Sequence, residues 1–422
     1  MATSRKRSRQ RRQQLSIEPL TSNDLVFDAM VRHQTGVLRM ASGVGRSVNR
    51  ILDATERDIR RAIRDRVGSA GFESPAQVKR LESLLAEIVA IRGPAWADAS
   101  AVMMGEAFQF AIAEPDLIDR IVRTVLPVQI DSTLPGARRL RAIVTRRPFE
   151  GRVLRQWAQK LERDDIARIQ GQIRIGLIQG ETPPQIARRV VGSARLRGRN
   201  GVTQITRQQA ESIILTANNH IANQARREYY RENDDILSQE LYTATLDAST
   251  TPICRRWDGH IFPIGKGPIP PLHFRCRSLR SPVFDGEVLG QRPSKPATER
   301  MLLREYAKAN NLDRVPLKRA ALPRGHKGAF DKFSRVRVRE LIGRVPAKTT
   351  YQQWLTSQSS AFQNDILGPT RAKLFRDGNL TLDRFVTAQG RELTLAELAV
   401  RDASAFRAAG LDPADFTRHR AA

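Results

Sequence analysis

The sequence is poor in cysteine and has no long apolar run. Two cysteines in 422 residues cannot form a disulfide framework, which favours folding in a reducing compartment. No segment approaches the about 18 consecutive apolar residues of a membrane span. The basic N-terminus is also not followed by the apolar stretch of a secretion signal. We therefore expect neither membrane insertion nor ordinary secretion.

Acidic and aromatic residues are also scarce. The chain has 71 Lys and Arg residues against 44 Asp and Glu residues, and its formal net charge is +27. Such an excess indicates a polyanionic partner, either nucleic acid or an acidic protein surface. Aromatic residues are 6% of the chain and are not interleaved with the basic runs, which disfavours stacking on single-stranded nucleic acid.

Size and hydrophobic content exclude a wholly disordered chain. Hydrophobic residues make up 40% of the sequence, which is close to ordinary globular usage. At about 150 residues per domain, the length predicts roughly two to four domains. We predict an α+β fold that is mostly α-helical.

The first 19 residues predict a flexible basic arm. Residues 1–14 contain basic side chains, no acidic residue and almost nothing apolar, so this stretch cannot bury enough surface to fold. Its candidate DNA contacts are Arg5, Arg7, Arg9, Arg11 and Arg12. A solubilising tail without a partner is the alternative.

Residues 20–149 predict a helical N-terminal region. One helix is expected from Pro75, because Val78, Leu81 and Leu85 recur at helical spacing. Gly93-Pro94 is predicted to end that helix. The apolar residues between 95 and 125 are dense enough to form a core or to pack against a partner.

Residues 150–290 predict a second helical group followed by a small, irregular β platform. A long helix is expected from Thr206 to near Asn233. Residues 241–246 (LYTATL) contain the mixture of β-branched, aromatic and apolar residues that is typical of a β-strand. The prolines between 252 and 283 exclude a regular helix there.

The remaining chain divides into a basic linker over 291–348 and a small α-rich C-terminal module over 349–422. The linker is rich in Lys and Arg, and its candidate DNA contacts are Arg324, Lys327, Arg335, Arg337 and Arg339. A solvated linker that contacts nothing is the alternative.

Residues 241–284 hold the densest set of chemically active side chains. Both cysteines of the chain, Cys254 and Cys276, lie there with His260 and His273. Two thiolates and two imidazoles could bind Zn²⁺ tetrahedrally. Only His273-x2-Cys276 has the short spacing of a structural zinc site, so buried packing cysteines and hydrogen-bonded histidines are the alternative.

The same segment also contains groups that can take part in catalysis. A Cys–His pair can form an activated thiolate, and Asp247 and Asp258 with the histidines resemble the ingredients of a metal-dependent nuclease. The spacing of these residues requires neither a Cys–His nucleophile nor a metal-dependent nuclease. We therefore predict no catalytic residue and a protein that is not an enzyme.

Three ordered motifs in this segment resemble a known family. The strings LYTATLDASTTPIC (241–254), WDGHIF (257–262) and PPLHFRCRS (270–278) are similar to the signature of the phage Mu F-like head morphogenesis family, also called minor capsid or minor head proteins. The resemblance covers about residues 150–285. Its matching positions are Asp247, Thr250, Cys254, Asp258, Gly259, Pro271, His273, Cys276 and Arg277.

The sequence departs from the family pattern at two places. Members often have Thr-Glu where this chain has Thr216-Ala217, so any role of that acid is absent. Many members repeat a cysteine where this chain has Cys276-Arg277-Ser278, which removes one possible zinc ligand.

The resemblance implies a virion component present in few copies and assembled in the host bacterial cytoplasm. Its implied partners are the portal protein, the major capsid or scaffolding protein, and packaged double-stranded DNA, which Lys and Arg contact without sequence preference. It implies no catalytic residue and no membrane. Two alternatives stay open: a Mu F-like delivery module of a toxin or other enzyme, and a non-specific DNA-binding protein outside the capsid.

Overall fold

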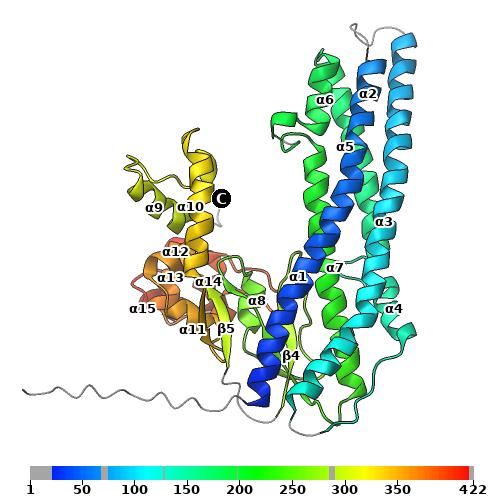
Figure 1. Cartoon of the computed structure of the whole chain (residues 1–422). Coiled ribbons are helices and arrows are strands. Elements are labelled where there is room, and N and C mark those ends of the chain that lie inside the picture. The colour runs from blue at the N-terminus through cyan, green and yellow to red at the C-terminus, as the bar shows by residue number, and fades with distance from the viewer. Residues whose placement is uncertain (1–20, 68–74, 127–128, 197, 285–289, 418–422) are drawn as a thin grey trace, which may run out of the picture.

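The computed structural model describes residues 21–67, 75–126, 129–196, 198–284 and 290–417. The predicted basic arm lies outside these residues. The chain forms a tall helical bundle with a smaller lobe beside it, and short strands lie between the two (Figure 1). The prediction of a mostly helical α+β fold is confirmed. Among the described residues, no helix is long and apolar enough to cross a membrane.

Among the residues that the structure describes, the bundle is formed by seven helices from the N-terminal half of the chain. They are α1 (Ser22–Ala54), α2 (Glu56–Arg66), α3 (Pro75–Val125), α4 (Ala137–Arg146), α5 (Leu154–Ile178), α6 (Pro183–Val191) and α7 (Thr203–Glu232), with a short 3₁₀ turn, η1 (Ala194–Leu196), before α7. One apolar cluster joins α1, α3, α5 and α7, and its members include Val37, Trp96, Met103, Trp157 and Ile214. The bundle therefore crosses the boundary predicted between residues 149 and 150.

Helix α3 is longer than the sequence predicted. The expected stop at Gly93-Pro94 is wrong, because α3 continues through Pro94 and Pro115 to Val125. A proline inside a helix removes one hydrogen bond and costs about 3 kcal/mol. Burial of Trp96, Met103 and other side chains of α3 against α1 and α7 offsets that cost.

Residues 239–283, which we call the platform, contain a three-stranded antiparallel sheet. Strand β1 (Gln239–Thr243) lies between β3 (Ile261–Pro263) and β4 (Leu279–Val283), and Leu241 pairs with Ile261 on one side and Ser281 on the other. The short helix α8 (Pro252–Trp257) connects β2 (Leu246–Asp247) to β3. The platform matches the small irregular β unit that the sequence predicted. The exclusion of a regular helix from 252–283 is wrong, because α8 begins at Pro252, and a proline in the first turn of a helix costs no hydrogen bond.

The smaller lobe, residues 290–417, begins where the sequence predicted a linker. The linker prediction for 291–348 is wrong. These residues form β5 (Gln291–Lys295), α9 (Glu299–Ala309), η2 (Arg319–Ala321), α10 (His326–Leu341) and β6 (Gly343–Pro346). Strand β5 pairs in parallel with β2 and antiparallel with β6. A small apolar cluster that includes Leu303, Tyr306 and Phe330 holds α9 against α10. The many basic residues hid this amphipathic pattern in the sequence.

The rest of the smaller lobe is the predicted α-rich C-terminal module. It contains α11 (Tyr351–Thr356), α12 (Ser360–Leu367), α13 (Pro369–Arg376), η3 (Leu382–Phe385), α14 (Leu395–Arg401), α15 (Ala403–Ala408) and α16 (Ala414–Thr417). Trp354, Phe375 and Phe406 are central to its core, and Leu246 of the platform belongs to the same cluster. The module therefore packs directly on β2.

A buried ion pair joins four helices of the bundle. Asp165 of α5 is fully buried, and its carboxylate accepts hydrogen bonds from Arg92 Nε at 2.8 Å, Trp96 Nε1 at 2.9 Å and Thr206 Oγ1 at 2.7 Å. Arg92 Nη1 also donates to Leu52 O of α1 at 2.8 Å. Each charge is thus neutralised, and most of its hydrogen-bonding capacity is satisfied inside the core.

We expect Asp165→Ala to lower the free energy of unfolding by about 3–5 kcal/mol, because it leaves the Arg92 guanidinium buried without a counter-charge. The neighbouring Asp164 is 35% exposed, and its ion pair among the described residues is with Lys160 of the same helix. Asp164→Ala is therefore the matched control, with an expected effect within about 0.5 kcal/mol. Urea denaturation of both variants measures the difference. Equal destabilisation by the two substitutions contradicts this account.

His220 of α7 makes the stability depend on pH. Burial lowers the pKa of His220 from 6.5 to about 4. Its Nε2 atom has no hydrogen-bond partner among the described residues. The unfolded chain therefore binds this proton below pH 6.5 while the folded chain does not. The stabilising contribution is complete above pH 6.5 and is lost as the pH falls toward 4.

We expect His220→Asn to flatten that dependence. Between pH 7 and pH 4 the parent chain should lose up to about 3 kcal/mol more of its unfolding free energy than the variant does. Urea denaturation at several pH values measures this difference directly. Parallel pH profiles for the two proteins contradict the assignment to His220.

Candidate metal centre and basic surface

The platform brings Cys254, His273 and Cys276 together. Cys254 Sγ lies 3.3 Å from His273 Nε2 and 3.7 Å from Cys276 Sγ. All three potential ligand atoms lie within 4.8 Å of one another. Cys254 belongs to α8, whereas His273 and Cys276 belong to the loop before β4, so the cluster joins two parts of the platform.

Hydrogen bonds orient the members of this cluster. His273 Nδ1 lies 2.7 Å from the carbonyl oxygen of Phe274, and that oxygen can only accept. The Nδ1 atom therefore carries the proton of the neutral ring, and the lone pair of Nε2 points toward Cys254. The Tyr242 hydroxyl donates to Cys254 Sγ at 3.3 Å. Both thiols are buried.

The two thiols are not equivalent. The hydrogen bond from Cys276 lowers the pKa of Cys254 well below its ordinary value, burial opposes this, and His273 lowers it further. The same hydrogen bond, together with burial, raises the pKa of Cys276. Burial lowers the pKa of His273, but the contact with Cys254 outweighs this effect and raises it overall. Cys254 is therefore the more readily ionised thiol.

His260, the fourth predicted ligand, lies outside the cluster. Its ring packs against the rings of Trp257 at 5.5 Å and Phe262 at 6.2 Å between centroids. Three of the four residues predicted for zinc are thus brought together. The sequence carries no signal for this difference, because His273 also has an aromatic neighbour, Phe274.

The signature aspartates are structural. Asp247 is buried and accepts two hydrogen bonds from Arg277, at 2.6 and 2.8 Å. Burial raises the pKa of Asp247, but Arg277 outweighs burial and the net shift is downward. Thr250 donates to the carbonyl oxygen of Thr245 and so closes the turn after β2. Pro271 follows a cis peptide bond two residues before His273.

Asp258 fastens the platform to the smaller lobe. Its carboxylate accepts from the Ala244 amide at 2.7 Å, the Tyr351 amide at 2.6 Å and Arg292 at 3.0 Å. Tyr351 in turn donates to the Asp247 carbonyl oxygen at 2.9 Å. Sequence reasoning missed Arg292 and Tyr351, because both lie outside the signature and only the fold brings them to it.

The candidate DNA contacts of the sequence fall in two places. Those of the N-terminal arm lie outside the described residues. In the smaller lobe, Arg324, Arg335 and Arg339 are exposed, whereas Lys327 is half-buried. Arg337 pairs with Glu305 at 2.8 Å and with Glu340 at 3.1 Å, so its charge is partly neutralised.

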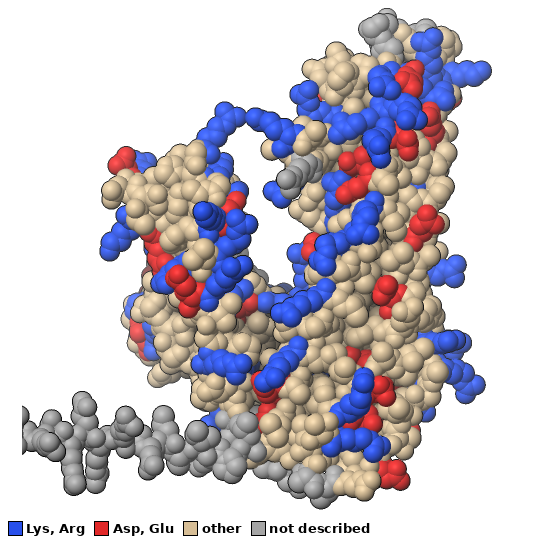
Figure 2. All heavy atoms as spheres, in the orientation of Figure 1, with Lys and Arg blue, Asp and Glu red and all other residues tan. Residues whose placement is uncertain are grey.

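One face of α10 is positively charged. Lys332, Arg335 and Arg339 are exposed and lie three and four residues apart, which places them on the same side of the helix. Figure 2 shows a hollow between the smaller lobe and the bundle with Lys and Arg on both of its walls. We call Lys332, Arg335 and Arg339 the basic stripe.

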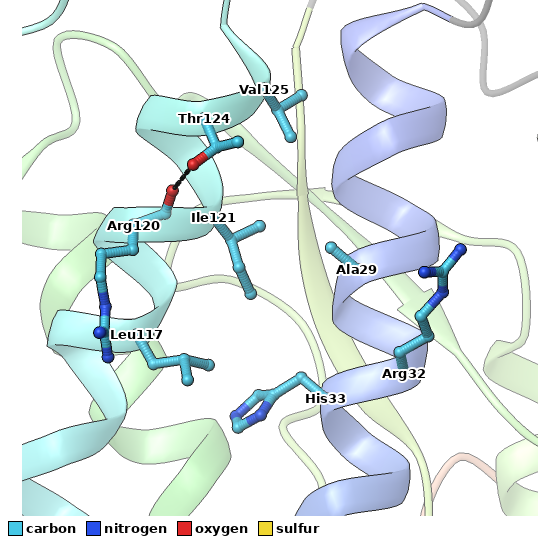
Figure 3. A pocket seen from close by; sticks show the side chains of 8 residues that line it. All are labelled: Ala29, Arg32, His33, Leu117, Arg120, Ile121, Thr124 and Val125. Atoms are coloured by element: carbon cyan, nitrogen blue, oxygen red, sulfur yellow. Dashed lines mark hydrogen bonds between the residues drawn. The ribbon is translucent and has the colours of Figure 1, made fainter.

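A separate groove lies between α1 and the C-terminal part of α3 (Figure 3). It has a volume of about 430 Å³, and half of its lining residues are apolar, among them Leu117 and Ile121. Arg32 and Arg120 also line it. His33 points into this region, and its Nε2 lies 2.7 Å from Glu114. Glu114 also forms a buried ion pair with Arg226 of α7, so these ionisable groups stabilise the packing of the bundle helices.

Residues 167–280 match the family described as Phage Mu protein F like protein. The match begins in α5 and ends in β4, and it includes the whole cysteine–histidine cluster. It confirms the resemblance to the phage Mu F-like head morphogenesis family over these residues. No curated protein and no solved structure matches the chain.

Gly259, in the signature Asp-Gly pair, has a conformation that requires glycine. Its φ is +83°, and an added Cβ would lie 2.6 Å from Thr350 Cγ2. We expect Gly259→Ala to destabilise the fold by about 2 kcal/mol or more, through backbone strain and a weaker junction with the smaller lobe.

Gly328 on α10 is the matched control for this substitution. A Cβ added at Gly328 would meet no described atom within 4 Å, and the φ of this residue is not positive. Gly328→Ala should leave stability unchanged or raise it by about 0.5–1 kcal/mol. Thermal unfolding of the two variants compares them. An equally small effect at Gly259 contradicts the proposed constraint.

Proposed function

We propose that this chain, whose residues 167–280 are a Phage Mu protein F like segment, is a structural and assembly protein of a phage head. In this proposal it is a minor component of the virion, associated with the portal vertex and with packaged DNA. The family match supports the assignment to the head. The observation that carries the DNA contact is the charged hollow between the two lobes.

Both lobes contribute positive charge to this hollow. The basic stripe lies on α10, and Arg195 and Arg199 are exposed in the connection between α6 and α7. The hydrogen bond from Arg319 chiefly lowers the pKa of Asp331 on α10, and the charges of Arg335 and Arg199 lower it further. Arg199 of the bundle is therefore close to α10.

A DNA duplex that passes along this hollow would meet cations from two sides. Lys and Arg contacts to phosphates release condensed counterions, so affinity falls as salt rises, and they carry no direct sequence information. A head protein that contacts whatever DNA is packaged needs this kind of binding. The net charge of +27 further favours such contact.

We expect the triple variant Lys332→Glu, Arg335→Glu and Arg339→Glu to weaken binding of the full chain to double-stranded DNA. The slope of log K against log salt should become shallower by about three, one for each phosphate that the variant no longer neutralises. Fluorescence anisotropy with two unrelated duplexes of equal length measures affinity, slope and sequence preference together.

The matched control carries the same change of charge elsewhere. Lys79, Arg80 and Arg138 are exposed on α3 and α4 of the bundle. Their replacement by Glu should alter the slope by less than about one, through long-range charge alone. If the two triple variants lose affinity equally, the effect is one of net charge and the hollow is not the binding surface.

The assembly role is tested by recovery of partners. Tagged protein should co-purify with the portal and shell proteins of the same phage at low and at high salt. Recovery of nucleic acid alone, sensitive to nuclease and lost at high salt, would support a DNA-binding protein outside the capsid instead. Turnover by the purified chain in nuclease or ADP-ribosyl transfer assays would favour the toxin-delivery alternative.

A further inference from the structure

We propose that Cys254, His273 and Cys276 bind one Zn²⁺ ion that fastens α8 to the loop before β4. The inference is independent of the proposed function, since it concerns the platform alone. Among the described residues, these three side chains are the group whose ligand atoms converge closely enough to hold a metal.

The observed distances suit a tetrahedral ion. With Zn–S bonds of about 2.3 Å and tetrahedral angles, two thiolates on one zinc lie about 3.8 Å apart. A thiolate and an imidazole nitrogen lie about 3.6 Å apart. The corresponding separations here are 3.7 Å between the two Sγ atoms and 3.3 Å between Cys254 Sγ and His273 Nε2. Two of the three separations are therefore close to those of a tetrahedral site, and the third, between Cys276 Sγ and His273 Nε2, is at most 4.8 Å.

The orientation of His273 supports the same conclusion. A metal-binding histidine commonly donates its other ring N–H to a carbonyl or carboxylate oxygen, which fixes the tautomer and aims the free lone pair at the metal. The 2.7 Å contact from Nδ1 to Phe274 O is of this kind, and Nε2 points toward both sulfurs.

The donor set selects the metal. Two thiolates with one imidazole favour a thiophilic ion such as Zn²⁺ over Mg²⁺ or Ca²⁺, which prefer oxygen. Zn²⁺ takes a fourth ligand, and a water can supply it on the side where His273 is half-exposed. Tyr242 lies 3.3 Å from Cys254 Sγ and donates to it, so it supports the thiolate.

A disulfide between the two cysteines fits the structure less well. The bond length is about 2.05 Å, and the sulfurs are 3.7 Å apart. Bond formation would remove both thiolates as metal ligands. It would also leave the aimed lone pair of His273 without a partner.

The consequence of metal binding is structural. Cys276 lies beside α7, because Asn219 of that helix donates to the Cys276 carbonyl oxygen at 2.9 Å. Cys254 lies in α8, which packs against η3 of the smaller lobe. The ion would thus join the part of the platform held by the bundle to the part held by the smaller lobe.

The test uses the full chain, purified under reducing conditions and dialysed against metal-free buffer. Elemental analysis should find about one zinc per chain. After removal of the metal, titration with Co²⁺ should give a thiolate-to-cobalt charge-transfer band and tetrahedral d–d bands that saturate at one equivalent. Added Zn²⁺ should then displace the cobalt.

Variants identify the ligands. Cys254→Ser and Cys276→Ser should abolish the charge-transfer band or reduce it sharply. His273→Ala, at a half-exposed position, should weaken Zn²⁺ binding at least tenfold. His260→Ala is the matched control, since His260 lies in the same platform outside the cluster, and it should bind zinc as the parent does. Circular dichroism verifies that each variant is folded.

The outcomes separate the possibilities. A folded, fully reduced chain that contains no zinc and gives no cobalt spectrum overturns the proposal. Metal that is retained by all three ligand variants shows a different or adventitious site and also overturns it. If His260→Ala also loses zinc, His260 is a fourth ligand. The three-residue site is then wrong and the site has four protein ligands.

Discussion

The buried polar face of α7 is the constraint on which the rest of the structure depends. Asn219 accepts from Gln34 of α1 at 2.8 Å and donates to the carbonyl oxygens of Cys276 and Ser278. Arg226 donates to Glu114 of α3 at 2.6 Å. One helix therefore satisfies groups of the bundle and of the platform at the same time. Buried polar groups are costly when unpaired, so the two sides are fixed relative to each other.

The family segment is consequently not a self-contained domain in this chain. Helices α1 and α3, which precede it, cover α7 and supply partners for its polar side chains. On the opposite side, Arg292 and Tyr351 of the smaller lobe complete the hydrogen bonds of the signature residue Asp258. The role of a signature residue such as Asp258 is therefore to join the platform to the smaller lobe.

Helices with clear periodicity and the signature segment could be predicted from the sequence, because both depend on local patterns. Residues 75–93 fall in a helix, as predicted, whereas the prolines from 252 to 283 did not exclude the short helix α8, which begins at Pro252. The stop at Pro94 was wrong because burial of Trp96 and its neighbours, which is a tertiary effect, outweighs the local cost of proline. The linker was wrong because its basic residues mask the spacing of Leu303, Tyr306 and Phe330. His260 could not be separated from His273 by spacing alone, since only the fold turns one toward the cysteines and the other toward Trp257.

The central claim is that α1, α3 and α7 form one cooperative unit with the family segment. Hydrogen–deuterium exchange of the full chain, followed by mass spectrometry at increasing sub-denaturing urea, tests it most directly. The account predicts that buried amides of these three helices and of β4 open with the same free energy and the same urea dependence. Retention of protection in α7 and β4 after α1 and α3 have exchanged would show that the family segment is stable without them, and would contradict the account.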